Sequence, residues 1–246
     1  MWLIVFAFGL LIGSFLNVCI YRIPVGKSIV SPPSSCGSCG HRLNYVDMIP
    51  VLGFLIFRRK CRYCGEKISF QYPMVEFLNA ALYVLLYVRY GLTLYFLLYG
   101  FISSMLIVIS LIDLKTQTIP DKLNLLGGIV TLILGIYLFR GNYINHIFGF
   151  LFGFLFFLII AVLTNAMGGG DIKLMGVLGL LLGFGGILFV TVLSFVYGAI
   201  ISVFLLLLKK ATRKDFIPFG PFIALAALTY ILYGNELLSI YMNLFI

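Results

Sequence analysis

Residues 187–208 read ILFVTVLSFVYGAIISVFLLLL and contain no charged side chain. A helix that crosses a bilayer needs about 20 consecutive, mainly apolar residues. This stretch therefore predicts a membrane-spanning helix. Similar apolar runs recur along the 246-residue chain, in which 62% of the residues are hydrophobic and only 10% are charged. So little polar surface excludes a soluble globular protein and predicts a polytopic membrane protein.

The apolar runs predict an all-α membrane fold with eight transmembrane helices. Residues 1–21 lack the basic start and the small-residue cleavage site of a secretory signal peptide, so we expect them to remain as the first helix. The later spans are expected over residues 73–88, 93–113, 121–139, 144–166, 172–184, 187–208 and 216–234.

A polar segment, residues 24–72, interrupts this pattern directly after the first span. It carries more than half of the net positive charge, four of the five cysteines and four of the eight prolines. We therefore divide the chain into a first transmembrane helix (1–23), a small polar domain (24–72) and a seven-helix membrane domain (73–246).

The basic residues predict the orientation in the membrane. If residues 24–72 are cytoplasmic, the alternation of sides puts three loops on that side as well: 114–120, 167–171 and 209–215. Of the 17 Lys and Arg residues, only Arg89 and Arg140 then lie outside. The positive-inside rule favours this arrangement, and both chain ends then lie outside the inner membrane.

The formal net charge of +9 has the same origin. It reflects topology and contact with anionic membrane lipid. The sequence offers no fold or aromatic-basic motif for nucleic acid, so we expect no nucleic-acid partner.

Four cysteines of the polar domain form two CxxC pairs, Cys36-Gly-Ser-Cys39 and Cys61-Arg-Tyr-Cys64, with 21 residues between them. Each CxxC turn places two sulfur atoms on one side of a tight loop, and four thiolates close a tetrahedral zinc shell with no open position. We therefore predict a structural zinc site. Disulfides and free thiols are the alternatives, and a cytoplasmic location disfavours disulfides. In so small a domain the metal would supply much of the folding energy.

Two aspartates lie where predicted spans meet the cytoplasmic boundary. Asp113 follows the apolar run 103–112, and Asp171 follows the glycine run 168–170. A single boundary aspartate is as often a helix cap or a solvated side chain. Two on one side can share a proton, and in aspartyl proteolysis such a pair activates water and protonates the peptide carbonyl. The helix dipoles favour an ionised Asp171 at a helix start and a protonated Asp113 at a helix end.

In their order along the chain, the motifs resemble those of the type IV prepilin peptidases, a family of intramembrane aspartyl proteases with a GxGD motif. The resemblance covers nearly the whole sequence. The matching stretches are GSFLNVCIYRIP (13–24), the two CxxC pairs, Ile49-Pro50, YPMVE (72–76), DLKTQTIPD (113–121), GGGDIK (168–173) and PFGP (218–221).

This resemblance implies that Asp113 and Asp171 form the catalytic pair. The substrate would be a prepilin or pseudopilin, whose short basic leader is cleaved after a glycine at the cytoplasmic face. Many members also methylate the new N-terminus with S-adenosylmethionine. The family commonly has glycine at the position of Arg59, and an arginine there could block a close approach to the backbone. Glu76 is a candidate for the methyl-transfer site, or a partner of Arg22 or Lys173.

Supporting roles are expected for a set of residues around the aspartates. Glycines let a substrate strand approach the backbone, although glycine is also common in helix packing. An acid after proline suits the first turn of a helix, a lysine near the boundary can reach the interface, and prolines begin or kink the last helix. The set comprises Asp121, Gly168, Gly170, Lys173, Pro218, Gly220 and Pro221.

Two functions of other classes remain open. An ion-coupled transporter also uses paired membrane carboxylates and glycine-broken helices. Transport sites, however, lie near the bilayer midplane within repeated halves, whereas both aspartates here lie at one face and no internal repeat is evident. A non-catalytic, zinc-bearing membrane scaffold is the other alternative, and it predicts that both aspartates are dispensable.

Overall fold

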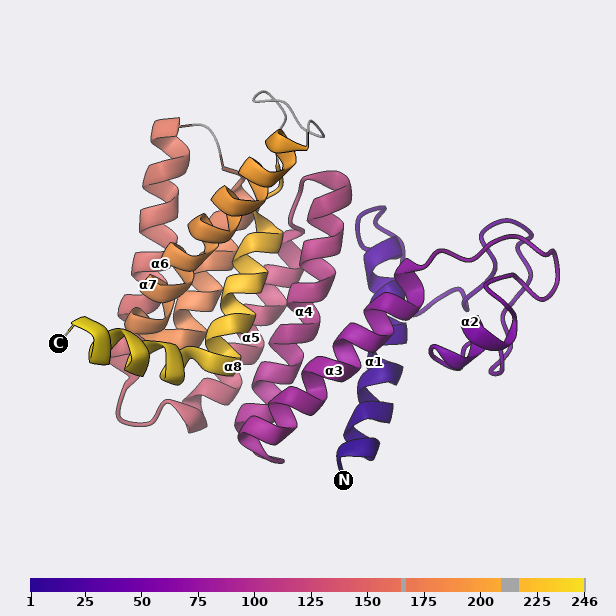
Figure 1. The fold of residues 1–246 in the computed structure, drawn as a ribbon, viewed down its shortest axis with the longest axis horizontal. Coiled ribbons are helices and arrows are strands. Elements are labelled where there is room, and N and C mark those ends of the chain that lie inside the picture. Colours follow the sequence, from indigo (N-terminus) through magenta and orange to yellow (C-terminus); the bar gives the residue numbers. More distant parts are fainter. Residues whose placement is uncertain (165–166, 209–216, 246) are drawn as a thin grey trace. The chain divides into compact units, whose positions relative to one another are not determined.

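The computed structural model describes residues 1–164, 167–208 and 217–245 (Figure 1). Within these ranges the chain forms eight helices, together with two isolated antiparallel bridges in the cysteine-rich segment. The predicted all-α fold is confirmed. The chain divides into two compact units, residues 1–108 and 109–246. The predicted cytoplasmic loop 209–215 lies outside the described residues.

Among the described residues, five helices are long and apolar enough to cross a membrane, fewer than the eight predicted. They are α1 (Trp2–Arg22), α4 (Leu94–Thr116), α5 (Asp121–Leu138), α6 (Tyr143–Thr164) and α7 (Gly169–Leu207). The second predicted span lies in α3 (Gln71–Tyr90), whose polar side chains include Glu76 and Asn79. Two predicted spans fall together in α7, and the last falls in α8 (Gly220–Phe245).

In the first unit, α1 packs against α3 through small residues. Gly9 and Gly13 lie one turn apart on α1, and a Cβ at either position would come within 2.6 Å of the Cα of Ala80 or Glu76. Small residues at this spacing let two membrane helices approach closely. The side chain of Asn79 donates a hydrogen bond to the Gly9 carbonyl at 2.8 Å, which fixes the register of the two helices.

In the second unit, α7 folds back on itself at Gly183, whose backbone is non-helical with φ 73° and ψ 179°. A Cβ at Gly153 of α6 would touch both Met175 and Ile187, which lie on opposite sides of the break. Along a continuous helix these two residues would be about 18 Å apart. The halves of α7 therefore both lie against α6, and they correspond to the two separate spans that the sequence predicted (Figure 1).

Two neighbouring residues of α6 take over the hydrogen bond that this break opens. In a continuous helix the Phe184 N–H would donate to the Leu180 carbonyl. Here it donates to Oδ1 of Asn145 at 3.2 Å, and the Leu180 carbonyl lies 2.9 Å from Nδ1 of His146. A carbonyl can only accept, so Nδ1 carries the proton and donates. Both backbone groups are satisfied, which stabilises the reversal.

The second half of α7 positions the start of α8. Gly198 leaves room for the rings of Phe219 and Phe222, and Phe219 also packs 5.3 Å from the ring of Phe195 between centroids. Further along, the Tyr197 hydroxyl lies 3.2 Å from the Thr229 hydroxyl. Through these contacts α7 determines where the first residues of α8 lie.

Candidate carboxylate site and cysteine cluster

Asp113 lies in the last turn of α4 and is only 4% exposed. Its Oδ2 accepts a hydrogen bond from the backbone N–H of Gly220 at 3.0 Å, and its carbonyl accepts one from Gln117 at 2.8 Å. A Cβ at Gly220 would come within 2.7 Å of the same Oδ2. The first residue of α8 must therefore be glycine for the amide to reach this carboxyl group.

Asp171 lies in the first turn of α7 and is 7% exposed. Its Oδ2 accepts a hydrogen bond from the N–H of Gly168 at 3.3 Å, as a carboxylate does when it caps a helix start. Its Oδ1 is buried and has no hydrogen-bond partner among the described residues. A Cβ at Gly170 would come within 2.6 Å of Cβ of Ile119, so this glycine allows the 118–120 segment to lie against the start of α7.

The structure brings Asp113 and Asp171 to one cleft of about 210 Å³. The end of α4, the segment that follows it, the glycine run and the residue before α8 surround this space. Its lining residues are Asp113, Gln117, Thr118, Ile119, Gly168, Gly169, Gly170, Asp171 and Phe219. Two carboxyl groups with little solvent exposure thus face one small volume.

The remaining predicted supporting residues lie around the cleft. Lys173 and Asp121 form an ion pair at 2.7 Å, and both side chains are largely exposed. Exposed pairs of this kind contribute little stability. Pro218 and Pro221 flank the two residues that reach the site, and Pro221 lies in the first turn of α8, where its missing N–H costs no helical bond.

Two residues near the cleft were missed by the sequence analysis. Asn124 of α5 is buried and donates from Nδ2 to the Gly170 carbonyl at 3.0 Å, while its Oδ1 has no partner among the described residues. The sequence did offer one indication of this role: Asn124 is a polar amide in an apolar predicted helix, one turn after Pro120. Phe219 lines the cleft, but an aromatic residue between a proline and a glycine gave no indication of this role.

In the first unit, the sulfur atoms of Cys36, Cys39, Cys61 and Cys64 all lie within 4.8 Å of one another. Each CxxC turn is closed by a backbone hydrogen bond of 2.9 Å, from Gly40 to the Cys36 carbonyl and from Gly65 to the Cys61 carbonyl. Four sulfurs at about 2.3 Å from a tetrahedral zinc ion would be about 3.8 Å apart. The sulfurs of Cys36 and Cys64 are 3.9 Å apart, so this cluster can hold a metal ion.

The thiols of Cys36 and Cys64 differ in pKa. Hydrogen bonds from the backbone N–H groups of Cys39 and Ser38 lower the pKa of Cys36 to about 6. For Cys64, a backbone hydrogen bond from Glu66 is outweighed by desolvation and by the neighbouring sulfurs, which raise its pKa to about 12. The Cys36 thiolate therefore forms readily, whereas a thiolate at Cys64 is opposed by the neighbouring sulfurs. A bound cation would reduce the repulsion between the thiolates.

Glu76 is buried near the start of α3, where its Oε2 accepts a hydrogen bond from the N–H of Val51 at 2.8 Å. This bond ties the cysteine-rich domain to α3. The two basic residues considered as partners make other contacts: Arg22 donates to the carbonyls of Ser28 and Pro32, and Lys173 pairs with an aspartate.

These features define a class of protein: a polytopic helical membrane protein with a buried carboxyl pair and a four-cysteine cluster that can hold a metal ion. Residues 7–90 match the bacterial peptidase A24 N-terminal domain, and residues 100–203 match the type IV leader peptidase family. The chain belongs to the type IV leader peptidase family and is a peptidase.

Three relatives share the name prepilin leader peptidase/N-methyltransferase. The protein of Bacillus subtilis is 32% identical, with 98% of each chain covered. That of Pseudomonas putida is 31% identical over 96% of this chain and 92% of its own, and that of Aeromonas hydrophila is 32% identical over 99% and 94%. No solved structure matches the chain.

Proposed function

We propose that this protein is an intramembrane aspartyl peptidase that removes the basic leader of type IV prepilins or pseudopilins after a glycine. The relatives are named for prepilin leader cleavage. The observation that carries the proposal is that Asp113 and Asp171, each more than nine-tenths buried, line one cleft beside a run of three glycines.

In the proposed reaction the two carboxyl groups share one proton. The ionised carboxylate removes a proton from a water molecule whose oxygen attacks the carbonyl carbon, while the protonated partner donates to the carbonyl oxygen. When the tetrahedral intermediate collapses, the C–N bond breaks and the leaving nitrogen takes up a proton. No covalent bond to the enzyme forms. The glycine run leaves backbone room for the substrate strand.

The resting protonation follows from the helix dipoles. Asp171 lies in the first turn of α7, where the positive end of the dipole favours an ionised carboxylate. Asp113 lies near the negative end of α4, which favours the protonated form. The pair titrates as a unit. Infrared difference spectra of the Asp113→Asn and Asp171→Asn variants would assign the protonated carboxyl, and a signal lost only with Asp171 would reverse the assignment.

We propose that the cysteine cluster holds structural zinc. Four cysteines fill a tetrahedral shell, so the ion would stabilise the domain and leave no position for substrate.

Methyl transfer from S-adenosylmethionine is proposed from the relatives' names alone. Glu76 stays the candidate residue for this activity: its carboxylate is 6% exposed and accepts a hydrogen bond from Val51, which leaves acceptor sites on the carboxylate. Labelled cofactor that transfers no methyl group to cleaved pilin would remove this activity.

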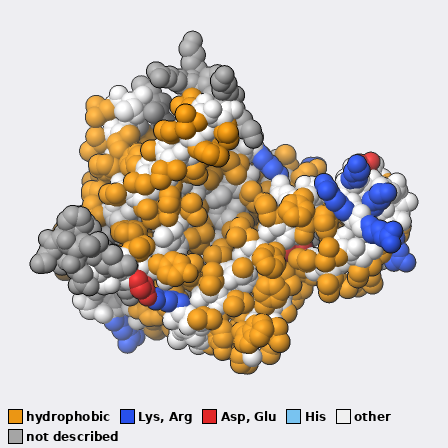
Figure 2. Space-filling view, viewed as in Figure 1, with side chains coloured by type: hydrophobic (Ala, Val, Ile, Leu, Met, Phe, Trp, Pro, Cys, Tyr) orange, Lys and Arg blue, Asp and Glu red, His pale blue; other side chains and the backbone are white. Residues whose placement is uncertain are grey.

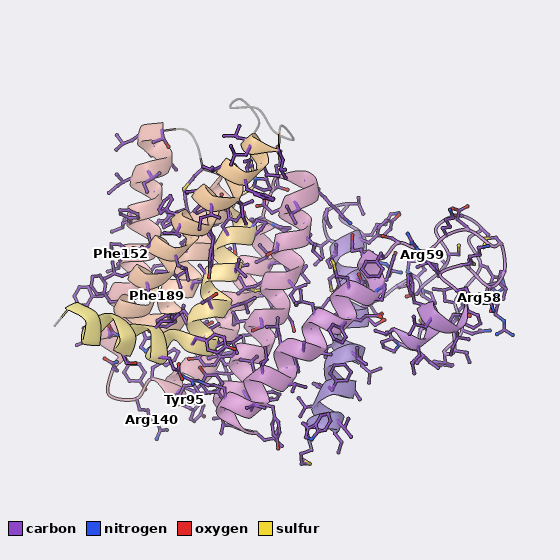
Figure 3. All side chains as sticks on the ribbon, viewed as in Figure 1. Arg58, Arg59, Tyr95, Arg140, Phe152 and Phe189 are labelled. Atoms are coloured by element: carbon purple, nitrogen blue, oxygen red, sulfur yellow. The ribbon has the colours of Figure 1, made fainter. Side chains whose placement is uncertain are left out.

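We propose a cytoplasmic cleft in the inner membrane. Nearly all basic residues lie on the predicted inner side, and Arg140 is one of the two exceptions. Arg140 lies between α5 and α6 (Figure 3), and the start of α6 contacts the α7 break at Gly183, whereas Asp171 lies in the first turn of α7. Labelling of single cysteines with a membrane-impermeant maleimide checks the orientation: from outside, a cysteine at position 140 should react and one at position 117 should not.

The decisive experiment presents a prepilin with a basic leader to the purified enzyme in detergent. Wild type and the matched control Asp121→Asn should cleave it, since the exposed Asp121 lies outside the cleft lining. Asp113→Asn and Asp171→Asn should not. Wild-type rates in either variant would reject the aspartyl mechanism and favour a scaffold, whereas loss of proton flux with unchanged cleavage would favour a transporter.

A further inference from the structure

The short helix α2 (Leu52–Ile56) presents an apolar face outward from an otherwise polar domain. The side chains of Leu52, Leu55 and Ile56 are 55%, 63% and 61% exposed. Their spacing of three and four residues puts them on one side of the helix. A neighbouring side of the helix carries Gly53, which is buried and where a Cβ would lie 3.0 Å from the Asp47 carbonyl. The apolar side is therefore the one that the domain leaves uncovered.

The helix α2 lies beside the start of α3. The residue before α2, Val51, donates its N–H to Glu76 within the first two turns of α3. The ring of Phe54 lies 6.1 Å from that of Phe70, the residue before α3. Since α3 packs against the candidate span α1, these contacts hold α2 beside the start of α3 (Figure 1).

Basic residues follow α2 directly. The helix ends in a Schellman motif, in which Arg58 donates its N–H to the Leu55 carbonyl at 3.1 Å and Arg59 donates to the Phe54 carbonyl at 2.9 Å. Arg58, Arg59 and Lys60 are all exposed. In Figure 2 basic side chains are spread over the visible surface of this domain, with hydrophobic side chains below them, and Figure 3 shows Arg58 pointing away from the domain.

We propose that α2 is an interfacial helix that inserts Leu52, Leu55 and Ile56 into the boundary between headgroups and acyl chains. Arg58, Arg59 and Lys60 would then contact anionic lipid phosphates. A helix with an apolar face and neighbouring basic residues binds an anionic membrane surface by sinking its apolar face about 5 to 10 Å into the boundary between headgroups and acyl chains. The face would thereby lose its contact with water, and the domain would be docked on the bilayer independently of catalysis.

The chain contains one tryptophan, Trp2, which makes a clean fluorescence experiment possible. In a Trp2→Phe background, tryptophan is placed at Leu55 of the proposed membrane face, or at the exposed Arg42 beside the first CxxC pair as the matched control. Both full-length proteins are reconstituted in anionic nanodiscs with lipids brominated near the headgroup end of the acyl chains. The expected result is roughly twofold lower emission for Leu55→Trp and little change for Arg42→Trp.

Metal content and prepilin cleavage are measured on the same samples, which shows that the domain is folded and keeps this result separate from the proposed function. Unquenched Leu55→Trp emission in folded protein would overturn the proposal, as would emission that shifts only when prepilin is added, because a protein would then cover α2. Adding Arg58→Glu and Lys60→Glu should reduce the quenching in anionic discs to that in zwitterionic discs. Unchanged quenching would overturn the contact with anionic lipid.

Discussion

The cysteine cluster and the carboxylate cleft bring residues together in different ways. Each CxxC turn is closed by its own backbone hydrogen bonds, so Cys36 and Cys61 lie beside their partners for local reasons. In the cleft, by contrast, Asp113 is held by an amide 107 residues further along the chain. The cluster therefore depends on local turns and on the metal ion that we propose it holds, whereas the cleft depends on how helices of the second unit pack.

The largest effect is expected from removing a ligand of the cysteine cluster. Cys61→Ser leaves three thiolates, and a structural four-cysteine site supplies about 10 to 16 kcal/mol of binding free energy that is also folding free energy. Residues 24–72 should unfold and become sensitive to protease, while the helices of the second unit remain resistant. Elemental analysis and limited proteolysis in detergent measure both outcomes.

Cys19→Ala is the matched control, because Cys19 is a buried cysteine of α1 outside the cluster. It should retain the metal and the protease resistance of wild type. If Cys61→Ser also kept both, the domain would be held by its turns alone and the contrast between the two regions would disappear.

The next effect concerns the cleft. A methyl group at Gly220 would overlap Oδ2 of Asp113, so Gly220→Ala should displace the carboxyl group and lower kcat for prepilin cleavage by roughly 100-fold. Metal content should not change. Gly185→Ala is the control, since a Cβ there has no atom within 4 Å. Equal rates for the two variants would mean that the amide of Gly220 does not position Asp113 during catalysis.

This difference also explains how far the sequence could lead. Two CxxC pairs at the right spacing predict the cluster because their geometry is local. The neighbourhood of Asp113 and Asp171 predicted two boundary carboxyls, but not the amide of Gly220 or the side chain of Asn124, since both reach the cleft only through tertiary packing. Among the described residues fewer helices qualify as spans than the sequence predicted, because two predicted spans fall together in α7 and α3 carries the polar side chains of Glu76 and Asn79.

A smaller effect is expected at the α7 reversal. His146→Phe keeps an aromatic ring stacked on Phe139 but removes the donor to the Leu180 carbonyl, and a partly buried acceptor left unpaired costs about 1 to 3 kcal/mol. Thermal unfolding in detergent should show the loss. Tyr143→Phe removes an exposed hydrogen bond to the Ile136 carbonyl from the same end of α6 and should have little effect. Equal changes would show that His146 does not stabilise the reversal.

The smallest effect is a gain in stability at Arg59. Its φ is 64°, in the left-handed region that glycine adopts without strain and other residues adopt at about 1 kcal/mol or more. Arg59→Gly should therefore raise the unfolding temperature of the metal-bound cysteine-rich domain. Its long, exposed bond from Nε to the Ile68 carbonyl, at 3.4 Å, offsets little of this gain.

Lys60→Gly is the control, because Lys60 is not among the described residues with positive φ and glycine there should only destabilise. The pair of variants decides what a glycine at position 59, which the family resemblance leads us to expect, would do there. A gain in stability with methyl transfer unchanged would mean that glycine serves the left-handed turn after α2. A gain in methyl transfer without a gain in stability would mean instead that glycine makes room for a substrate, as the sequence alone suggested.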